Sequence, residues 1–151
     1  MVEFTLMAPI LIALGFGAGE FGRAIHQYHA VNKGTRDAAR FLARVPVTCP
    51  PGGGVGSFDD ANDVTRAKNL AMTGYAGGGS PIIGYWTDPS TVTISVDCYD
   101  NSDGTFRKYS EIPRISVSVA LPYQDMGFLS LLGVSDTITM QIGHQQIHIG
   151  E

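Results

Sequence analysis

At 151 residues the chain is long enough for one domain with its own hydrophobic core and too short for two. An apolar content of 44% with 16% charged residues is high for a free soluble domain, and much of the excess lies near the N-terminus. Residues 1–44 contain five basic and three acidic residues, a charge of +2, whereas the remainder contains five and eleven, a charge of −6. We therefore expect a basic stem and an acidic head, with different neighbours.

The first predicted element is an apolar helix. From Phe4 to Gly19, 16 consecutive residues carry no charge. A membrane-spanning helix needs about 20 apolar residues, so the run is marginal for spanning. A buried core helix remains an alternative, and so does a signal peptide, although a signal peptide would have basic residues first and here Glu3 precedes the run.

Beyond Gly19 the pattern becomes amphipathic. Apolar positions recur every three or four residues up to Leu42, and Arg36, Arg40 and Arg44 fall on one shared face. Nothing stops the helix before Pro46, so it would be roughly 66 Å long. A small head cannot bury that length, so lipid or other subunits must cover about half of it.

Glycines in the stem suggest close contacts between helices. Gly15 and Gly19 form a GxxxG pair, with Gly17 and Gly22 nearby. Small residues at this spacing let helix backbones approach closely in lipid. The alternative is a loosely formed or kinked anchor, because four glycines and Pro9 lower helix propensity.

The orientation of the stem and the two cysteines give conflicting indications. Basic residues follow the apolar run, which by the positive-inside tendency would place the head in the cytoplasm. Cys49 and Cys98 would form a disulfide in a head outside the cytoplasm, joining the end of the stem to a strand, and would be two buried thiols otherwise. A basic leader before Met1, removed by processing, would resolve the conflict, and we predict one.

The head begins after Pro46. The segment PPGGGVG lacks the Gly-Lys-Ser/Thr of a phosphate loop and is interpreted as a flexible turn. Residues 63–74 then have helical spacing, with Asp63 as the expected N-cap and Gly74 as the stop.

Three strand-like runs follow this helix. Apolar residues alternate from Val92 to Cys98, from Ile115 to Leu121 and from Ile138 to Ile142, and residues 100–109 hold a hairpin turn. We predict an α+β fold: a long N-terminal helix that changes from hydrophobic to amphipathic, residues 1–45, and a small head, residues 46–151, with a short helix and an antiparallel sheet of three or four strands laid on the upper stem.

Candidate chemistry is weak. His144 and His148 could share a strand face, but they lack a third metal ligand and are interpreted as solvent-facing. Residues 99–104 fall short of a calcium loop because Tyr99 stands where an Asp is needed. Ser130 lacks the second glycine of a nucleophile elbow. We therefore predict no enzyme, no metal and no cofactor.

The N-terminal 44 residues resemble a known family. They contain an acid-aromatic pair, Glu3 and Phe4, an apolar run with an early Pro9, a second acid, Glu20, followed by Phe-Gly-Arg, and the basic Arg-Asp-Ala-Ala-Arg. This pattern resembles TadE-like proteins, and residues 117–148 are more loosely similar to the closing strands of that family. The middle of the chain is not covered by the resemblance.

The resemblance implies a pilin or pseudopilin of the tight-adherence (Tad) branch of type IV pilus systems. Such proteins are cut by a prepilin peptidase and moved by assembly machinery from the inner membrane into a filament at the cell surface. It also implies that Glu3 neutralises the terminal amine of a neighbouring subunit, although pilins usually have this acid at the fifth mature position. The alternative is that Glu3 lies at the headgroups and favours the helix N-terminus.

The sequence thus predicts a structural filament subunit that pairs with itself or with other pilins, without a specific nucleic-acid partner. The expected assembly residues are Glu3, Gly15, Gly19, Glu20 and Arg23. Two alternatives stay open. The chain could be a minor pilin that primes or caps a filament, or a membrane-anchored module that binds a ligand through aromatic residues near Tyr75, Tyr85 and Trp86.

Overall fold

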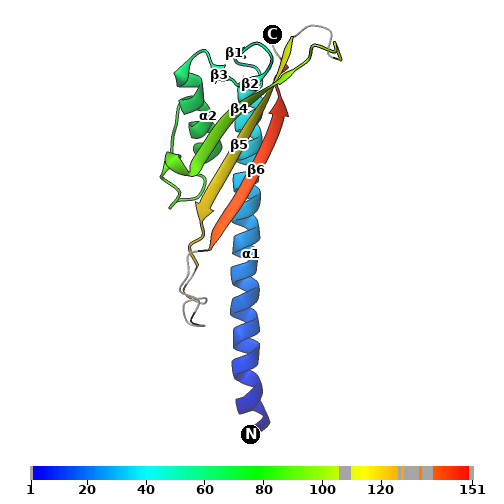
Figure 1. The fold of residues 1–151 in the computed structure, drawn as a ribbon. Coiled ribbons are helices and arrows are strands. Elements are labelled where there is room, and N and C mark those ends of the chain that lie inside the picture. Colours follow the sequence, from blue (N-terminus) through cyan, green and yellow to red (C-terminus); the bar gives the residue numbers. More distant parts are fainter. Residues whose placement is uncertain (1, 106–109, 126, 128–132, 134–137, 150–151) are drawn as a thin grey trace.

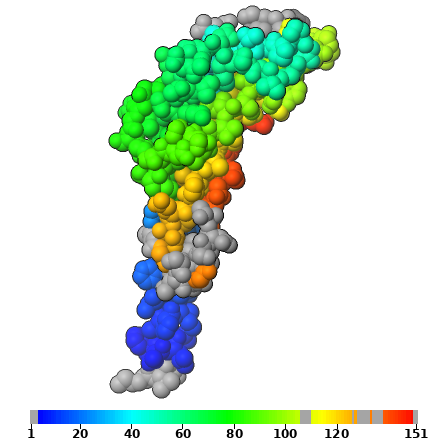
Figure 2. All heavy atoms as spheres, turned by 60° about the vertical axis from the view of Figure 1, so that its left-hand side comes forward, coloured from blue at the N-terminus to red at the C-terminus, as the bar shows by residue number. Residues whose placement is uncertain are grey.

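The computed structural model describes residues 2–105, 110–125, 127, 133 and 138–149, and for residues 2 and 3 the backbone alone. One long helix runs the length of the molecule, and a sheet and a second helix cover only its C-terminal half (Figure 1). The N-terminal half projects from the head as a stalk (Figure 2). The predicted α+β fold, a long stem with a small antiparallel head, is confirmed.

Helix α1 spans Val2–Leu42, 41 residues, and is therefore about 60 Å long. Pro9 lies inside it and removes one backbone donor. At the C-terminal end the amides of Arg44 and Val45 donate to carbonyls three residues earlier, at 3.1 and 3.3 Å. These tight bonds close the last turn, and Pro46 follows, as expected for a helix that only a proline stops.

The head contains two antiparallel sheets. The larger has the order β2-β4-β5-β6, with β2 at Gly54–Val55, β4 at Val92–Asp100, β5 at Glu111–Pro122 and β6 at Thr139–Ile147. The smaller pairs β1, Val47–Thr48, with β3, Ser57–Phe58. Alternate residues of β5 are fully buried, which confirms the predicted alternation. The backbone N–H of Asn101 donates a hydrogen bond to the Ser110 carbonyl at 2.8 Å, where the predicted hairpin between β4 and β5 begins to turn.

The core lies between the upper half of α1, the second helix α2 (Ala61–Thr73) and one face of the larger sheet. The two helices approach so closely that a Cβ added at Gly34 would lie 2.2 Å from the carbonyl oxygen of Ala71. The fully buried apolar residues come from all three layers: Val31, Ala38, Ala39 and Leu42 of α1, Ala67 and Ala71 of α2, and Ile115, Val117, Val119 and Leu121 of β5. The upper stem is therefore part of the hydrophobic core of the head.

Helix α2 spans Ala61–Thr73, and its start differs from the prediction. Its N-cap is Asp60, whose carboxylate accepts the amide of Asn62 at 2.8 Å, and the predicted cap, Asp63, lies in the first turn. Asp63 is buried and pairs with Arg66 at 3.2 Å. The predicted stop is confirmed, because Gly74 adopts a left-handed conformation with φ 78° and its amide donates to the Leu70 carbonyl.

The glycine-rich segment after Pro50 is more ordered than the flexible turn that was predicted. Gly54 and Val55 form the edge strand β2, which pairs with Cys98 and Asp97 of β4. Gly53 has a φ of 90°, and a Cβ there would lie 2.8 Å from the Cys98 carbonyl oxygen. Glycine is needed at this position both for its backbone conformation and for the close approach to β4.

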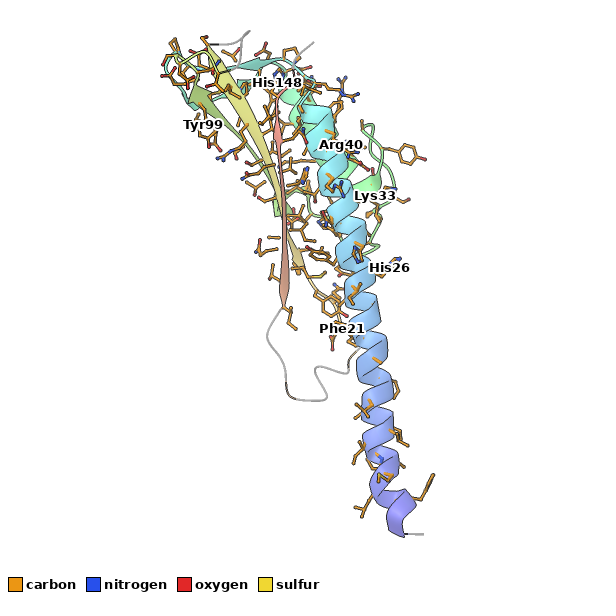
Figure 3. All side chains as sticks on the ribbon, turned by 90° about the vertical axis from the view of Figure 1, so that its right-hand side faces the viewer. Phe21, His26, Lys33, Arg40, Tyr99 and His148 are labelled. Carbon is orange, nitrogen blue, oxygen red and sulfur yellow. A yellow bond between two sulfur atoms is a disulfide. The ribbon has the colours of Figure 1, made fainter. Side chains whose placement is uncertain are left out.

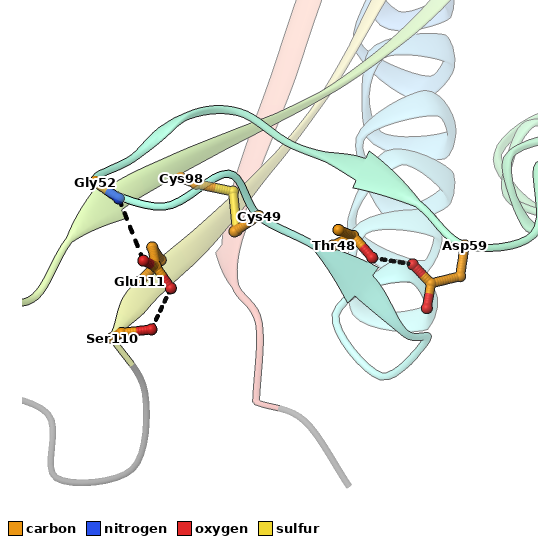
Figure 4. Close-up of a disulfide and its surroundings, with 7 residues drawn as sticks. All are labelled: Thr48, Cys49, Gly52, Asp59, Cys98, Ser110 and Glu111. Carbon is orange, nitrogen blue, oxygen red and sulfur yellow. Dashed lines mark hydrogen bonds between the residues drawn. A yellow bond between two sulfur atoms is a disulfide. The ribbon is translucent and has the colours of Figure 1, made fainter.

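Cys49 and Cys98 form a disulfide, with their Cα atoms 5.8 Å apart (Figure 4). It joins the segment after the stem to β4. The neighbouring loop is held by the Gly52 amide, which donates to Glu111 at 3.3 Å, and by the Thr48 hydroxyl, which donates to Asp59 at 2.7 Å. The disulfide expected for a head outside the cytoplasm is therefore present.

Candidate functional site

The lower stem, residues 4–19, has large apolar side chains that no other described part of the chain covers. By length and composition the helix could cross a membrane, and very little of its apolar stretch is buried among the described residues. Phe4 and Leu11 are 77% and 65% exposed. The alternative of a buried core helix therefore does not hold for this segment, because the described residues of the head do not cover it.

The stem glycines leave an open surface. A Cβ added at Gly15, Gly19 or Gly22 would meet nothing within 4 Å. Among the described residues, therefore, nothing packs against the GxxxG pair, in contrast to Gly34, which α2 covers. A second helix could approach the backbone at Gly15 and Gly19 without displacing any of the residues that the structure describes.

Glu20 lies where the stem meets the base of the head. It is 6% exposed, and its carboxylate accepts a hydrogen bond from the hydroxyl of Tyr123, which follows β5. The Tyr123 hydroxyl also lies 3.3 Å from the Glu20 carbonyl oxygen. Burial, and then the bond to the Glu20 carboxylate, raise the pKa of Tyr123 to about 12. The Glu20 carboxylate therefore has a role within the subunit, since it fastens the end of β5 to the stem.

A second hydrogen bond between the stem and the head lies about two helical turns beyond Glu20, toward the C-terminal end of α1. The hydroxyl of Tyr85 donates to the side-chain carbonyl of Gln27 at 2.8 Å, and Gln27 is buried on α1. The backbone N–H of Gln124 donates in turn to the Tyr85 hydroxyl at 3.5 Å. Like Glu20 with Tyr123, this pair joins residues far apart in the sequence, so no local pattern indicated it.

The three aromatic residues of the binding-module alternative do not form one surface. Trp86 is 2% exposed and its indole donates to the Thr91 hydroxyl at 2.7 Å. Tyr85 is half-buried against Gln27, and Tyr75 is exposed. The predicted aromatic patch near these residues is therefore absent from the described part of the chain.

Two hollows flank the junction of stem and head. Arg23, the last of the predicted assembly residues, is half-buried. It lines the first hollow, which has a volume of about 400 Å³, together with His26, Gln27 and the loop at Ile82–Tyr85. The other, of about 290 Å³, is apolar and is lined by Gly17, Glu20, Phe21, Ala24, Tyr123, Ile138 and Met140. Phe21 is 68% exposed beside this groove, so the apolar surface of the lower stem continues up to the head.

The outer face of the upper stem is basic. His29, Lys33, Arg36, Arg40 and Arg44 are spaced by four, three, four and four residues and are all exposed, opposite the buried face of Val31, Ala38 and Leu42. Figure 3 shows Lys33 and Arg40 on the same side of α1. The predicted common face of Arg36, Arg40 and Arg44 is thus confirmed and extends one further turn or more toward the N-terminus.

The C-terminal histidines differ from the prediction that they face solvent. Both are half-buried, and a ring nitrogen of His148 lies 2.9 Å from the Val45 carbonyl oxygen, within hydrogen-bond distance. His148 also donates its amide to the Pro113 carbonyl at 2.9 Å. Among the described residues there is no group of three His, Cys, Asp or Glu side chains arranged to hold a metal ion.

Two expectations lie outside the described residues. The side chain of Glu3 is not described, so its predicted pairing with a terminal amine stays a prediction. Ser130 is not described either, and neither is the Leu-Leu segment at 131–132 on which the looser C-terminal resemblance partly rested.

Comparison with known proteins supports the resemblance at the stem. Residues 1–40 match the family model of TadE-like proteins, so the resemblance seen in the sequence is confirmed over this range. The match covers most of the stem, whose helix is by length and composition able to cross a membrane. No curated protein and no solved structure matches the chain.

Proposed function

We propose that this chain, whose first 40 residues match TadE-like proteins, is a structural subunit of an extracellular type IV pilus-like filament. After removal of a leader by a prepilin peptidase, the stem resides in the inner membrane, and the assembly machinery transfers it into the filament. There it packs against the stems of identical subunits or of other pilins. The proposed role involves no catalysis and no cofactor.

One observation carries the proposal. In a helix of 41 residues, the upper half belongs to the core of the head, whereas the lower half has its large apolar side chains exposed. An isolated subunit in water would leave that surface unfavourably hydrated. Lipid before assembly and neighbouring stems after assembly both remove it from water, and the open glycines support the second of these contacts.

The test is electron microscopy of filaments sheared from producing cells, with mass spectrometry of their subunits. The proposal expects this chain to be the dominant protein of the filaments. A trace amount beside another, abundant pilin would indicate the minor-pilin alternative. Retention of the whole pool in the membrane fraction would contradict the filament proposal and favour an anchored module.

A matched pair of variants asks whether the stem glycines take part. Gly19→Leu adds a bulky side chain to the open stem surface, and Gly77→Leu makes the same change in a head loop, where an added Cβ also meets nothing within 4 Å. Filament yield should fall strongly for Gly19→Leu and stay near the wild-type level for Gly77→Leu. Equal yields for the two variants would show that no helix packs closely at Gly19.

A further inference from the structure

The basic face of the upper stem is built almost entirely from one sign of charge. Five basic or titratable side chains, from His29 to Arg44, follow one another along about 22 Å of helix, with Asp37 at the edge of the row. None of Lys33, Arg36, Arg40 and Arg44 forms an ion pair within the part of the chain that the structure describes. A shallow hollow of about 300 Å³ runs between these side chains, lined by His29, Asn32, Lys33, Arg36, Asp37 and Arg40.

This arrangement is unfavourable for an isolated subunit. Like charges four residues apart on a helix repel one another, and Arg36, Arg40 and Arg44 form two such pairs in succession. A solvated helix face usually mixes both signs, so that neighbouring side chains attract. A row of cations with one carboxylate, Asp37, at its edge, and with no ion pair to it among the described residues, is therefore suited to an anionic surface supplied from outside the subunit.

A bilayer does not fit this row well. Arg44 lies 25 residues beyond Gly19, about 37 Å along the helix axis. If residues 4–19 cross the membrane, headgroups reach the first turn or two beyond Gly19 and not Arg36, Arg40 and Arg44. The partner of the row therefore has to lie beside the upper stem, at the level of the head.

The head of a second copy has the complementary charge. Residues 45–151 carry −6, and the described head has exposed carboxylates at Asp59, Asp60, Asp88, Asp100 and Asp103. Hydrogen bonds from the backbone and hydroxyl of Ser90 lower the pKa of Asp88, and those from Thr105 lower the pKa of Asp103. These two carboxylates therefore keep their charge in mildly acid surroundings.

We infer that the basic face from His29 to Arg44 binds exposed carboxylates of the head of a second copy of this chain. This inference rests on the proposed function and names the partner of the upper stem in the assembly. The two contacting surfaces are different, so each copy still offers a free basic face and a free acidic head after pairing. Such heterologous contacts continue from copy to copy and build an open helical array rather than a closed dimer.

The test uses the full-length chain in a neutral detergent, with normal and isotopically heavy copies mixed in equal amounts. A zero-length carbodiimide reagent joins an amine to a carboxylate only when the two are in contact. The inference expects links between Lys33 of one copy and a carboxylate of residues 45–149 of the other, recognised by their mixed isotope content. These links should become weaker at high salt because the contact is electrostatic.

Three variants make the test specific. The double change Arg36→Glu with Arg40→Glu should reduce the mixed-isotope links at least about tenfold, because it places like charges against the acidic head. Lys68→Glu makes a change of the same sign on α2, beside Asp88, and should not reduce the links, because it makes the head more negative. Arg36→Lys with Arg40→Lys keeps the charge and adds amines, and should give new links from positions 36 and 40. Circular dichroism and melting curves establish that each variant is folded.

The outcomes separate the inference from the proposed function. Links that survive charge reversal, or links found only within single copies, would overturn the inference even if the chain is abundant in filaments. Salt-sensitive mixed links from a chain that is absent from filaments would support the inference and contradict the filament proposal. Retention on vesicles of anionic lipid that needs Arg36 and Arg40, without mixed links, would assign this face to a membrane surface and also overturn the inference.

Discussion

The two halves of α1 are one continuous helix in two different surroundings. From Phe4 to Phe16 most large apolar side chains are exposed, whereas Val31, Thr35 and Leu42 in the upper half have no exposed surface. The lower half is apolar around its circumference, and the upper half is apolar on one face and basic on the other. The difference shows that only the upper half is stabilised by the fold of the head, while the lower half depends on surroundings outside the subunit.

The largest expected effect concerns the disulfide, which acts on the head alone. The double change Cys49→Ser with Cys98→Ser removes the link between residues 49 positions apart. Because the unfolded chain then regains the conformational entropy that the disulfide had removed, the head should lose about 4 kcal/mol of stability. Chemical denaturation followed by tryptophan fluorescence measures it, since Trp86 is buried in the head. The helicity of the lower stem in detergent should not change. A loss of that helicity would mean that the two halves are coupled more strongly than their contacts indicate.

Truncating a leucine in each half of α1 compares the contributions of the two halves to the stability of the head most directly. Leu42→Ala removes a fully buried side chain and should destabilise the head by about 3 kcal/mol. Leu11→Ala removes one that is 65% exposed and should leave the melting of the head unchanged, while it weakens partition into membranes slightly. Thermal melting and membrane fractionation of both variants measure these effects. A Leu11→Ala protein with a less stable head would refute the division of α1 into two independent halves.

Two glycines on α1 should respond in opposite directions to the same change. Gly34→Ala places a methyl group against the Ala71 backbone, which cannot move aside easily, and should cost the head about 2 kcal/mol. Gly22→Ala meets nothing within 4 Å and should be neutral or slightly stabilising, because alanine favours the helix. Denaturation curves of the two variants measure the difference. Equal effects would mean that α2 does not contact α1 at Gly34.

The smallest expected effect concerns the tie between Glu20 and Tyr123. Tyr123→Phe removes the hydroxyl that donates to the Glu20 carboxylate and should cost about 1 kcal/mol, whereas Tyr75→Phe changes an exposed residue and should cost nothing. Because the pKa of Tyr123 is raised from 10.0 to about 12, its contribution is complete below pH 10 and is lost as the pH rises from 10 to 12. The stability of the wild type should therefore fall more steeply over this range than that of Tyr123→Phe. Parallel pH profiles would show that Tyr123 is not buried against Glu20.

The sequence alone determined the features that depend on local periodicity. Helical spacing up to Pro46 predicted α1, which ends a turn earlier at Leu42, and the alternation of apolar residues predicted strands that lie within Val92–Asp100 and Glu111–Pro122. The change from an apolar to an amphipathic stem also followed from composition, and so did the common face of Arg36, Arg40 and Arg44. These properties depend on neighbours within a few residues, so they are visible without a fold.

The tertiary structure decided which distant residues meet. Glu20 and Tyr123 are 103 positions apart, and their bond exists only because the end of β5 reaches the stem. Contact with β4 made a strand of Gly54 and Val55 in a segment with the composition of a flexible turn. Asp60 rather than Asp63 caps α2, and Asp63 lies in its first turn, where its side chain is buried and pairs with Arg66. Long-range contacts of this kind arise from packing, and composition and spacing do not encode them locally.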